Sequence, residues 1–79
     1  MQTSFIKIIQ GHPLEFNRLL FPLRYNIVNK GLESSGLRIS MEKDEKGIWK
    51  VDTSIKLPSW FDEISLDVHN AIIENENLR

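Results

Sequence analysis

The sequence contains no cysteine among its 79 residues. This absence excludes disulfides, thiolate zinc sites and thiol nucleophiles, and it fits a reducing compartment. No apolar run approaches the ~20 residues that a membrane-spanning helix needs. The N-terminal segment "MQTSFIKIIQGHP" has no basic residue ahead of its short apolar run, which Lys7 interrupts. We therefore expect no signal peptide, no membrane association and a cytoplasmic location.

Catalytic and cofactor motifs are also missing. The four glycines are scattered, so there is no glycine-rich phosphate loop, and neither a Gly-x-Ser-x-Gly nor a His-Glu-x-x-His motif occurs. His12 and His69 have no second metal ligand at a suitable spacing. Glu63, Asp67 and Glu74 share the polar side of an expected helix, where carboxylates are solvated and not tuned for acid–base catalysis. We predict no catalytic residue, no metal site and no cofactor, and hence no enzyme.

What the sequence does contain is typical of one small globular domain, with 41% hydrophobic and 27% charged residues. The net charge of −1 is unevenly distributed. Residues 1–40 carry five basic and two acidic side chains, a net charge of +3, whereas residues 41–79 carry five basic and nine acidic side chains, a net charge of −4. We interpret this asymmetry as an internal charge match between a basic sheet and an acidic helix.

Short apolar segments between glycines and prolines predict an antiparallel sheet. The expected strands cover approximately residues 4–10, 14–18, 23–29, 37–43 and 48–52. Gly11-His12-Pro13 is expected to form the first turn, and residues 30–36 a polar loop. Pro22 lacks an amide donor and belongs at a bulge, an edge or a strand end, so the placement of residues 19–23 stays open.

The best-defined local feature is a hairpin. Leu37, Ile39 and Met41 alternate with polar residues, and "DEKG" separates them from "IWKV". A short charged turn that ends in glycine predicts a positive φ at Gly47. We expect Trp49 to lie across from Met41 and to enter the core.

The last third of the chain has the period of an amphipathic helix, expected over residues 59–76. The apolar positions that recur every three to four residues are Phe61, Ile64, Val68, Ala71 and Ile72. Ser59 is a suitable N-cap, and Trp60 is expected to fix the start of the helix to the sheet. Because Glu74 and Glu76 oppose the helix dipole and no glycine follows, we expect the last turn to fray.

Together these elements predict a single α+β domain over residues 1–79, with a four- to five-stranded antiparallel meander and one C-terminal helix packed on one face. The order of elements resembles small uncharacterised bacterial proteins in which a meander ending in a Gly-x-Trp strand precedes one helix. The resemblance rests on Gly47, Trp49, Leu57-Pro58 and Ala71-Ile72. It implies the fold and carries no activity.

The first strand, "FIKII", needs apolar cover on both faces. Ile6 and Ile8 point to one face, and Phe5, Lys7 and Ile9 to the other. One helix covers only one face, and we place Phe5, Lys7 and Ile9 on the open one. Their apolar side chains are then either exposed singly or part of a contact patch.

The helix raises a similar question. Leu66 and Ile73 are seven residues apart beside His69, and they belong either to an extended core or to a contact surface. The interface hypothesis accordingly comprises Phe5, Lys7, Ile9, Leu66, His69 and Ile73.

Two functions are compatible with these features. The preferred one is a non-enzymatic protein-interaction module that forms a homodimer or binds another protein through the open sheet face. The alternative is a nucleic-acid-binding or regulatory protein that uses its basic N-terminal half. The candidate residues for that alternative are Phe16, Arg18, Arg24, Tyr25 and Arg38. A pI near 6.1 disfavours binding to polyanions.

Overall fold

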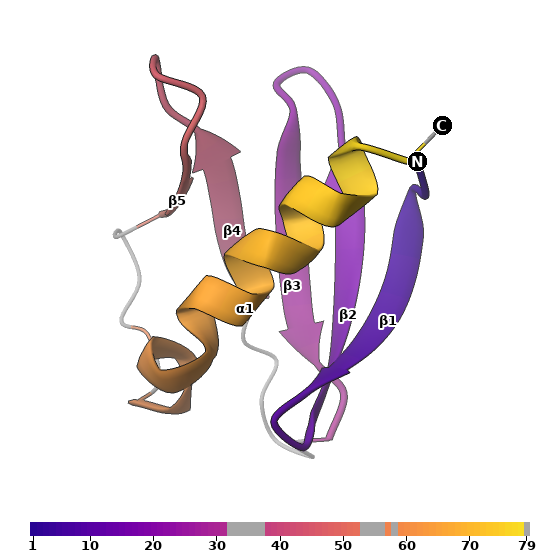
Figure 1. Ribbon diagram of the computed structural model, residues 1–79, viewed down its shortest axis with the longest axis vertical. Helices are drawn as coiled ribbons and strands as arrows, with labels where there is room; N and C mark the ends of the chain where they lie inside the picture. Colours follow the sequence, from indigo (N-terminus) through magenta and orange to yellow (C-terminus); the bar gives the residue numbers. More distant parts are fainter. Residues whose placement is uncertain (32–37, 53–56, 58, 79) are drawn as a thin grey trace.

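The computed structural model describes residues 1–31, 38–52, 57 and 59–78. Five strands form one antiparallel sheet in the order of the sequence, and one helix follows them. The elements are β1 (Ser4–Ile9), β2 (His12–Leu19), β3 (Arg24–Asn29), β4 (Arg38–Lys43), β5 (Trp49–Val51) and α1 (Ser59–Glu76). The helix crosses one face of the sheet diagonally, and the two termini lie at the same end (Figure 1). The expected α+β meander with one C-terminal helix is confirmed.

The turn between β1 and β2 is shorter than expected. Only Gln10 and Gly11 separate the strands, with φ angles of 48° and 83°. Two consecutive positive φ angles are typical of the type I′ turn, whose twist matches that of a β-hairpin. Ile9 therefore pairs with His12, and Phe5 pairs with Phe16. The prediction of a turn over Gly11-His12-Pro13 is wrong, because His12 and Pro13 already belong to β2.

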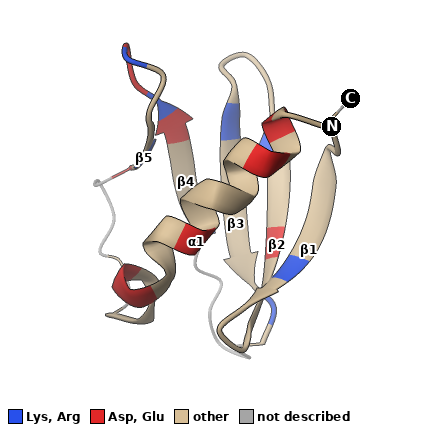
Figure 2. Ribbon diagram, in the orientation of Figure 1, with Lys and Arg blue, Asp and Glu red and all other residues tan. Residues whose placement is uncertain are grey.

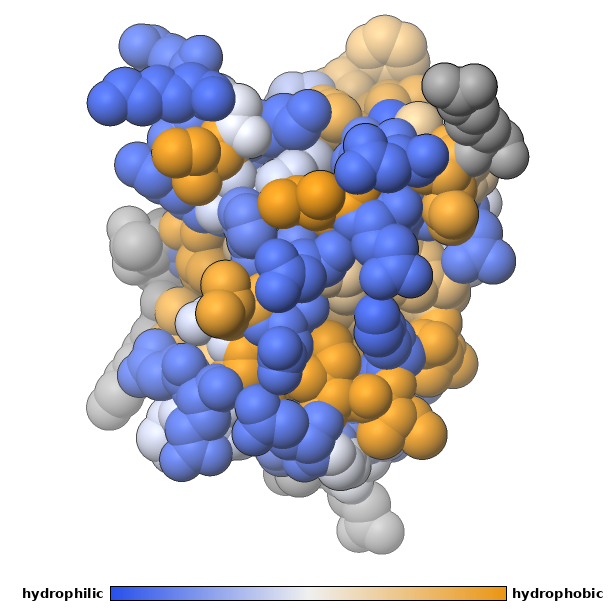
Figure 3. All heavy atoms as spheres, viewed as in Figure 1, coloured by the Kyte–Doolittle hydropathy of each residue, from blue (hydrophilic) through white to orange (hydrophobic). Residues whose placement is uncertain are grey.

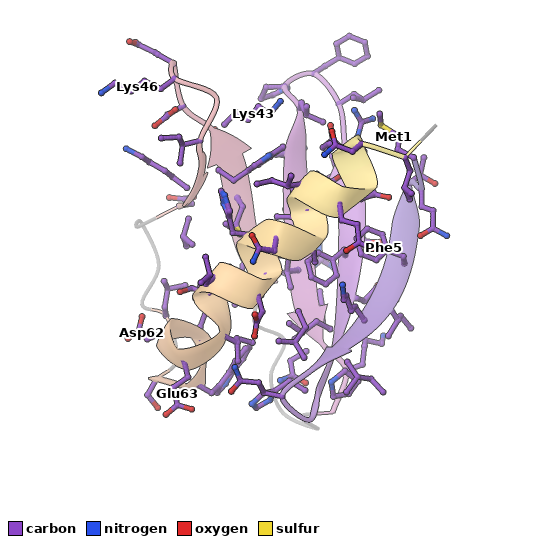
Figure 4. All side chains as sticks on the ribbon, viewed as in Figure 1. Met1, Phe5, Lys43, Lys46, Asp62 and Glu63 are labelled. Carbon is purple, nitrogen blue, oxygen red and sulfur yellow. The ribbon has the colours of Figure 1, made fainter. Side chains whose placement is uncertain are left out.

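This shorter turn reverses the faces of β1. Ile9 is only 5% exposed in the core, and the Phe5 ring stacks on Phe16 with 4.7 Å between centroids. Figure 4 shows Phe5 beside the C-terminal half of α1. Ile6 and Ile8 point away from the helix and are 61% and 71% exposed. Our placement of Phe5, Lys7 and Ile9 on the open face is wrong, because a change of register by an odd number of residues moves every side chain to the other face.

The remaining strands keep the expected faces. Tyr25 pairs with Met41 and Ile27 with Ile39, and all four side chains are buried. Residues 20–23 form the turn between β2 and β3, so Pro22 lies between strands. Most of the polar loop expected over residues 30–36, together with Leu37, lies outside the described residues.

The β4–β5 hairpin has the expected turn. Gly47 has a φ of 80°, and its N–H donates to the carbonyl of Asp44 at 3.0 Å. The Asp44 carboxylate accepts the N–H groups of Lys46 and Ile48 at 2.8 and 2.9 Å. Trp49 is buried as expected, but it pairs with Lys43 and not with Met41.

The core lies between the sheet and α1. Its buried apolar residues are Ile9, Leu14, Phe16, Tyr25, Ile27, Ile39, Met41, Trp49, Phe61, Ile64, Val68, Ala71 and Ile72. All five helix positions that the apolar period selected are in this set. Trp60 packs against the core and stacks on the ring of His12 at 4.9 Å, which fixes the start of the helix to β2.

Replacement of Ile64 by alanine tests this core. Ile64 is 1% exposed, so we expect a loss of about 2–4 kcal/mol in the free energy of unfolding, from lost burial and a residual cavity. Leu66→Ala on the same helix is the control, since Leu66 is 69% exposed and should change stability by under ~0.5 kcal/mol. Urea titration of both variants measures the difference. Equal losses would contradict the assigned helix face.

Replacement of Gly47 by alanine tests the hairpin turn. A Cβ at this position meets no atom within 4 Å, so the cost comes from the positive φ alone. We expect a destabilisation of about 1 kcal/mol. Gly47→Asn should cost less, because asparagine tolerates the left-handed conformation. Thermal unfolding of the two variants provides the comparison, and equal stability of Gly47→Ala and the unmodified protein would contradict the turn.

Candidate interaction surface

A polar cluster fastens the C-terminal end of α1 to the sheet. Arg18 donates from Nε and Nη2 to the two carboxylate oxygens of Glu76 at 2.7 and 3.2 Å. The Tyr25 hydroxyl also donates to Glu76 and accepts from Nδ2 of Asn75 at 2.8 Å. The prediction that this last turn frays is therefore wrong. Glu76 opposes the helix dipole, but its partners on β2 and β3 hold it in place.

The same end of the helix also positions β1. The side chain of Asn75, which is 3% exposed, accepts the N–H of Gln2 and donates to the Gln2 carbonyl, both at 2.9 Å. Lys7 lies 3.5 Å from Glu74 on the same flank of the helix. Lys7–Glu74 and Arg18–Glu76 are two ion pairs of the kind that the expected charge match between sheet and helix requires. Figure 2 shows acidic residues along α1 and basic ones on the strands behind it.

Hydrogen bonding within the cluster shifts two pKa values in opposite directions. Burial acts to raise the pKa of Glu76, but the hydrogen bonds from Arg18 and Tyr25 outweigh it and hold that pKa below its ordinary value. Burial, together with the hydrogen bond to Glu76, raises the pKa of Tyr25 to about 12. The fold therefore prefers an ionised Glu76 beside a neutral Tyr25.

These shifts predict how stability depends on pH. The lowered pKa of Glu76 contributes stability above the carboxyl's ordinary pKa of 4.5, and this is lost as the pH falls through the folded value. The raised pKa of Tyr25 contributes stability that is complete below pH 10 and lost between about pH 10 and 12. Urea titrations at pH 7 and pH 3 should show that Glu76→Gln loses less stability on acidification than the unmodified protein. An equal loss in both would contradict the assignment.

The open face of the sheet is largely polar. The side chains that point away from α1 in its middle row are Ser4, Asn17, Asn26 and Ser40, which pair in register across four strands. Ser4 donates to Oδ1 of Asn17 at 3.0 Å, so part of this row is linked by hydrogen bonds. A shallow hollow of about 340 Å³ lies beside it and is lined by Glu15, Asn17, Leu19, Asn26, Val28 and Arg38. Such a face is compatible with water and needs no cover.

No aromatic side chain of the five strands points to this face. Phe16 and Tyr25, two candidates for base stacking, are 0% exposed beneath the helix, and Arg18 is engaged with Glu76. The strands therefore lack the exposed aromatic platform on which sheet proteins stack nucleic-acid bases. Of the five candidate residues for the alternative function, Arg24 and Arg38 remain, without an aromatic side chain beside them on the open face.

The two edge strands of the sheet differ sharply. β5 has only three residues, and its lysine, Lys50, lies 3.2 Å from Asp44. β1 has six residues and no proline, and it exposes Ile6 and Ile8. Short length and charged side chains are the usual protection of an edge against pairing with another strand. β5 is protected by its short length, whereas β1 is twice as long and exposes two isoleucines.

The backbone of β1 also presents free pairing groups. The N–H of Arg18 donates to the carbonyl of Thr3 at 2.8 Å, which makes these two residues a hydrogen-bonded pair of the β1–β2 ladder. Because such pairs alternate along an antiparallel ladder, Phe5, Lys7 and Ile9 also bond toward β2. The N–H and C=O groups of Ser4, Ile6 and Ile8 then point away from the sheet.

The outer side of α1 has smaller apolar exposures. Leu66 and Ile73 are 69% and 39% exposed, and His69 is half-buried. Leu66 and Ile73 therefore do not extend the core. Figure 3, which views the helix side, shows apolar surfaces separated by hydrophilic ones. Of the six residues in the interface hypothesis, Leu66, His69 and Ile73 lie on this face, whereas Phe5, Lys7 and Ile9 lie between β1 and the helix.

The residues that the structure describes contain no cluster of three potential metal ligands and no helix that is long and apolar enough to cross a membrane. Comparison with protein-family models, curated proteins and solved structures found no match to this chain. The resemblance to small bacterial meander proteins therefore stays a prediction. The predicted interface residues did not include Ile6 and Ile8, which are exposed on the open face. Their exposure depends on the two-residue turn at Gln10 and Gly11, which sets the register of the first hairpin.

Proposed function

We propose that this protein is a non-enzymatic protein-interaction module that binds an extended segment of polypeptide along the edge of β1. The single observation that carries this proposal is the unprotected edge itself. It combines six residues of regular strand, outward N–H and C=O groups and the exposed side chains of Ile6 and Ile8. Strand addition uses these features, because backbone hydrogen bonds supply affinity and alternate side chains supply specificity.

The side chains of β1 define the chemistry of the segment. Ile6 and Ile8 lie on the open face at every second residue, so a bound strand should present apolar side chains in the same alternation. On the helix side, a hollow of about 450 Å³ runs beside β1 and is lined in part by Phe5, Lys7 and Glu74. A basic or amphipathic side chain of the added strand fits there, with its stem against Phe5 and its charge near Glu74.

Rigid support of the edge strengthens the proposal. Asn75 holds Gln2 through two hydrogen bonds, and Lys7 is paired with Glu74. At the other end of the strand, the Gln10 side chain donates to the carboxylate of Asp67 at 3.1 Å. Both ends of β1 are thus connected to the helix. A partner strand meets an edge that is already ordered, which reduces the entropic cost of binding.

A proline substitution provides a specific test. Because the N–H of Ile6 points away from the sheet, Ile6→Pro keeps the β1–β2 ladder but removes an outward donor and obstructs an added strand. Peptides of about ten residues would be selected from a displayed random library on the immobilised protein. We expect selected peptides with alternating apolar residues to bind the unmodified protein and to lose at least tenfold in affinity, about 1.4 kcal/mol, toward Ile6→Pro.

Ile6→Thr is the matched control, since threonine keeps the β-branch and the N–H but shortens the apolar side chain. It should retain more affinity than Ile6→Pro. Hydrogen exchange should show new protection at the amides of Ile6 and Ile8 when peptide is added. Unchanged affinity of Ile6→Pro, with protection confined to other elements, would refute strand addition at β1.

A further inference from the structure

The edge of β1 is complementary to the same edge of a second copy of the protein. Its outward N–H and C=O groups belong to Ser4, Ile6 and Ile8, which are spaced evenly on either side of Ile6. A twofold axis that is perpendicular to the sheet and runs midway between the Ile6 residues of two copies therefore brings every outward donor of one copy to an outward acceptor of the other. We infer that the segment bound at this edge is β1 of a second copy, paired antiparallel and centred on Ile6. This inference rests on the proposed function.

The side chains on the open face fit this register. Ile6 of one copy meets Ile6 of the other, and each Ile8 lies across from Ser4. Each Ile6 also has the second copy's Ile8 as a diagonal neighbour, at a distance that long side chains can reach. The two most exposed apolar residues of β1, at 61% and 71%, thus cover each other in one cluster. No charged side chain of β1 lies on this face.

The charges of Lys7 and Glu74, on the helix side of β1, favour a pair of β1 strands centred on Ile6 over one centred on Lys7. A pair centred on Ile6 places each Lys7 across from Phe5, in the hollow that Glu74 also lines. Glu74 and Lys7 retain 71% and 45% side-chain exposure, so this carboxylate can receive a second lysine. A pair centred on Lys7 would oppose the two lysines directly, and like charges in that position are destabilising. The register centred on Ile6 avoids this repulsion.

The resulting dimer is a continuous ten-stranded sheet with both helices on one face, because the axis is perpendicular to the sheet. Its ends are the two β5 strands, which have only three residues each. The assembly therefore closes as a dimer and does not propagate. The contact is small, since one strand per copy contributes, so self-association on the order of 100 µM is expected.

Single cysteines test the register, because the chain contains no cysteine of its own. Ile6→Cys places two thiols in directly paired positions, with Cα atoms about 5.5 Å apart, within the range for a disulfide. Ile8→Cys places them about four residues apart along the strands, roughly 14 Å, which is too far. Leu66→Cys, on an equally exposed helix position, measures random collision.

Each protein would be equilibrated near its association range in a glutathione redox buffer, and covalent dimer would be quantified on non-reducing gels. We expect Ile6→Cys to give at least about tenfold more dimer than Ile8→Cys or Leu66→Cys. Dimer from Ile8→Cys alone would overturn the register in favour of one centred on Ile8. Dimer only from a mixture of the Ile6 and Ile8 variants would overturn it in favour of one centred on Lys7.

Sedimentation equilibrium of the unmodified protein provides the second measurement. We expect a monomer–dimer equilibrium that Ile6→Pro abolishes and Leu66→Lys leaves unchanged. A monomer up to about 1 mM, with no excess of disulfide in Ile6→Cys, would overturn the second copy as occupant. The proposed function would survive that result if selected peptides still bound the edge and were blocked by Ile6→Pro, so the two failures are distinguishable.

Discussion

A single helix must cover a five-stranded sheet, and the rest of the structure depends on this constraint. The 18 residues of α1 span about 27 Å, enough to cross one face of the sheet diagonally and no more. The largest apolar side chains in the middle strands then point to that face, as Leu14, Phe16, Tyr25 and Ile27 do. β1 has apolar residues at both alternating sets of positions, so either set leaves some of them without cover.

Two side chains of β2 fix the position of the helix. His12, the first residue of that strand, stacks on Trp60, and Arg18, near its end, pairs with Glu76. These anchors are six residues apart on the strand, about 20 Å, and 16 residues apart on the helix, about 24 Å. The two lengths are similar, so both contacts can form at once and hold the helix against this face of the sheet. β1 is the edge strand beside β2, so its outer side stays open to another strand.

Much of the fold follows from the sequence, since the apolar period of α1 identifies its five buried positions and the alternation in β4 identifies Ile39 and Met41. The faces of β1 do not follow from its own residues, because both faces are apolar and the charge of Lys7 wrongly suggests that its face is the open one. In the structure Lys7 lies at the edge and reaches Glu74, so its charge remains partly solvated on the helix side. The deciding information is the two-residue turn at Gln10-Gly11, where glutamine adopts a positive φ that its residue type does not favour.

The polar cluster at Glu76 is beyond sequence analysis for a related reason. The helix dipole makes a carboxylate unfavourable at the C-terminal end of an isolated helix. The tertiary fold brings Arg18 and Tyr25 to that carboxylate from strands more than 50 residues away. The long-range contact outweighs the local preference.

The polar open face explains why the edge of β1, and not the face of the sheet, is the more favourable site for binding another strand. Serine and asparagine occupy the middle row of that face, so burying it would require new partners for each amide and hydroxyl. The edge of β1 has the opposite character, because its free backbone groups gain hydrogen bonds on pairing while Ile6 and Ile8 lose contact with water. A strand protected against pairing would carry its lysine at one of these outward positions. The only lysine of β1, Lys7, instead faces the helix and pairs with Glu74. Its charge therefore does not oppose the pairing of another strand with the edge of β1.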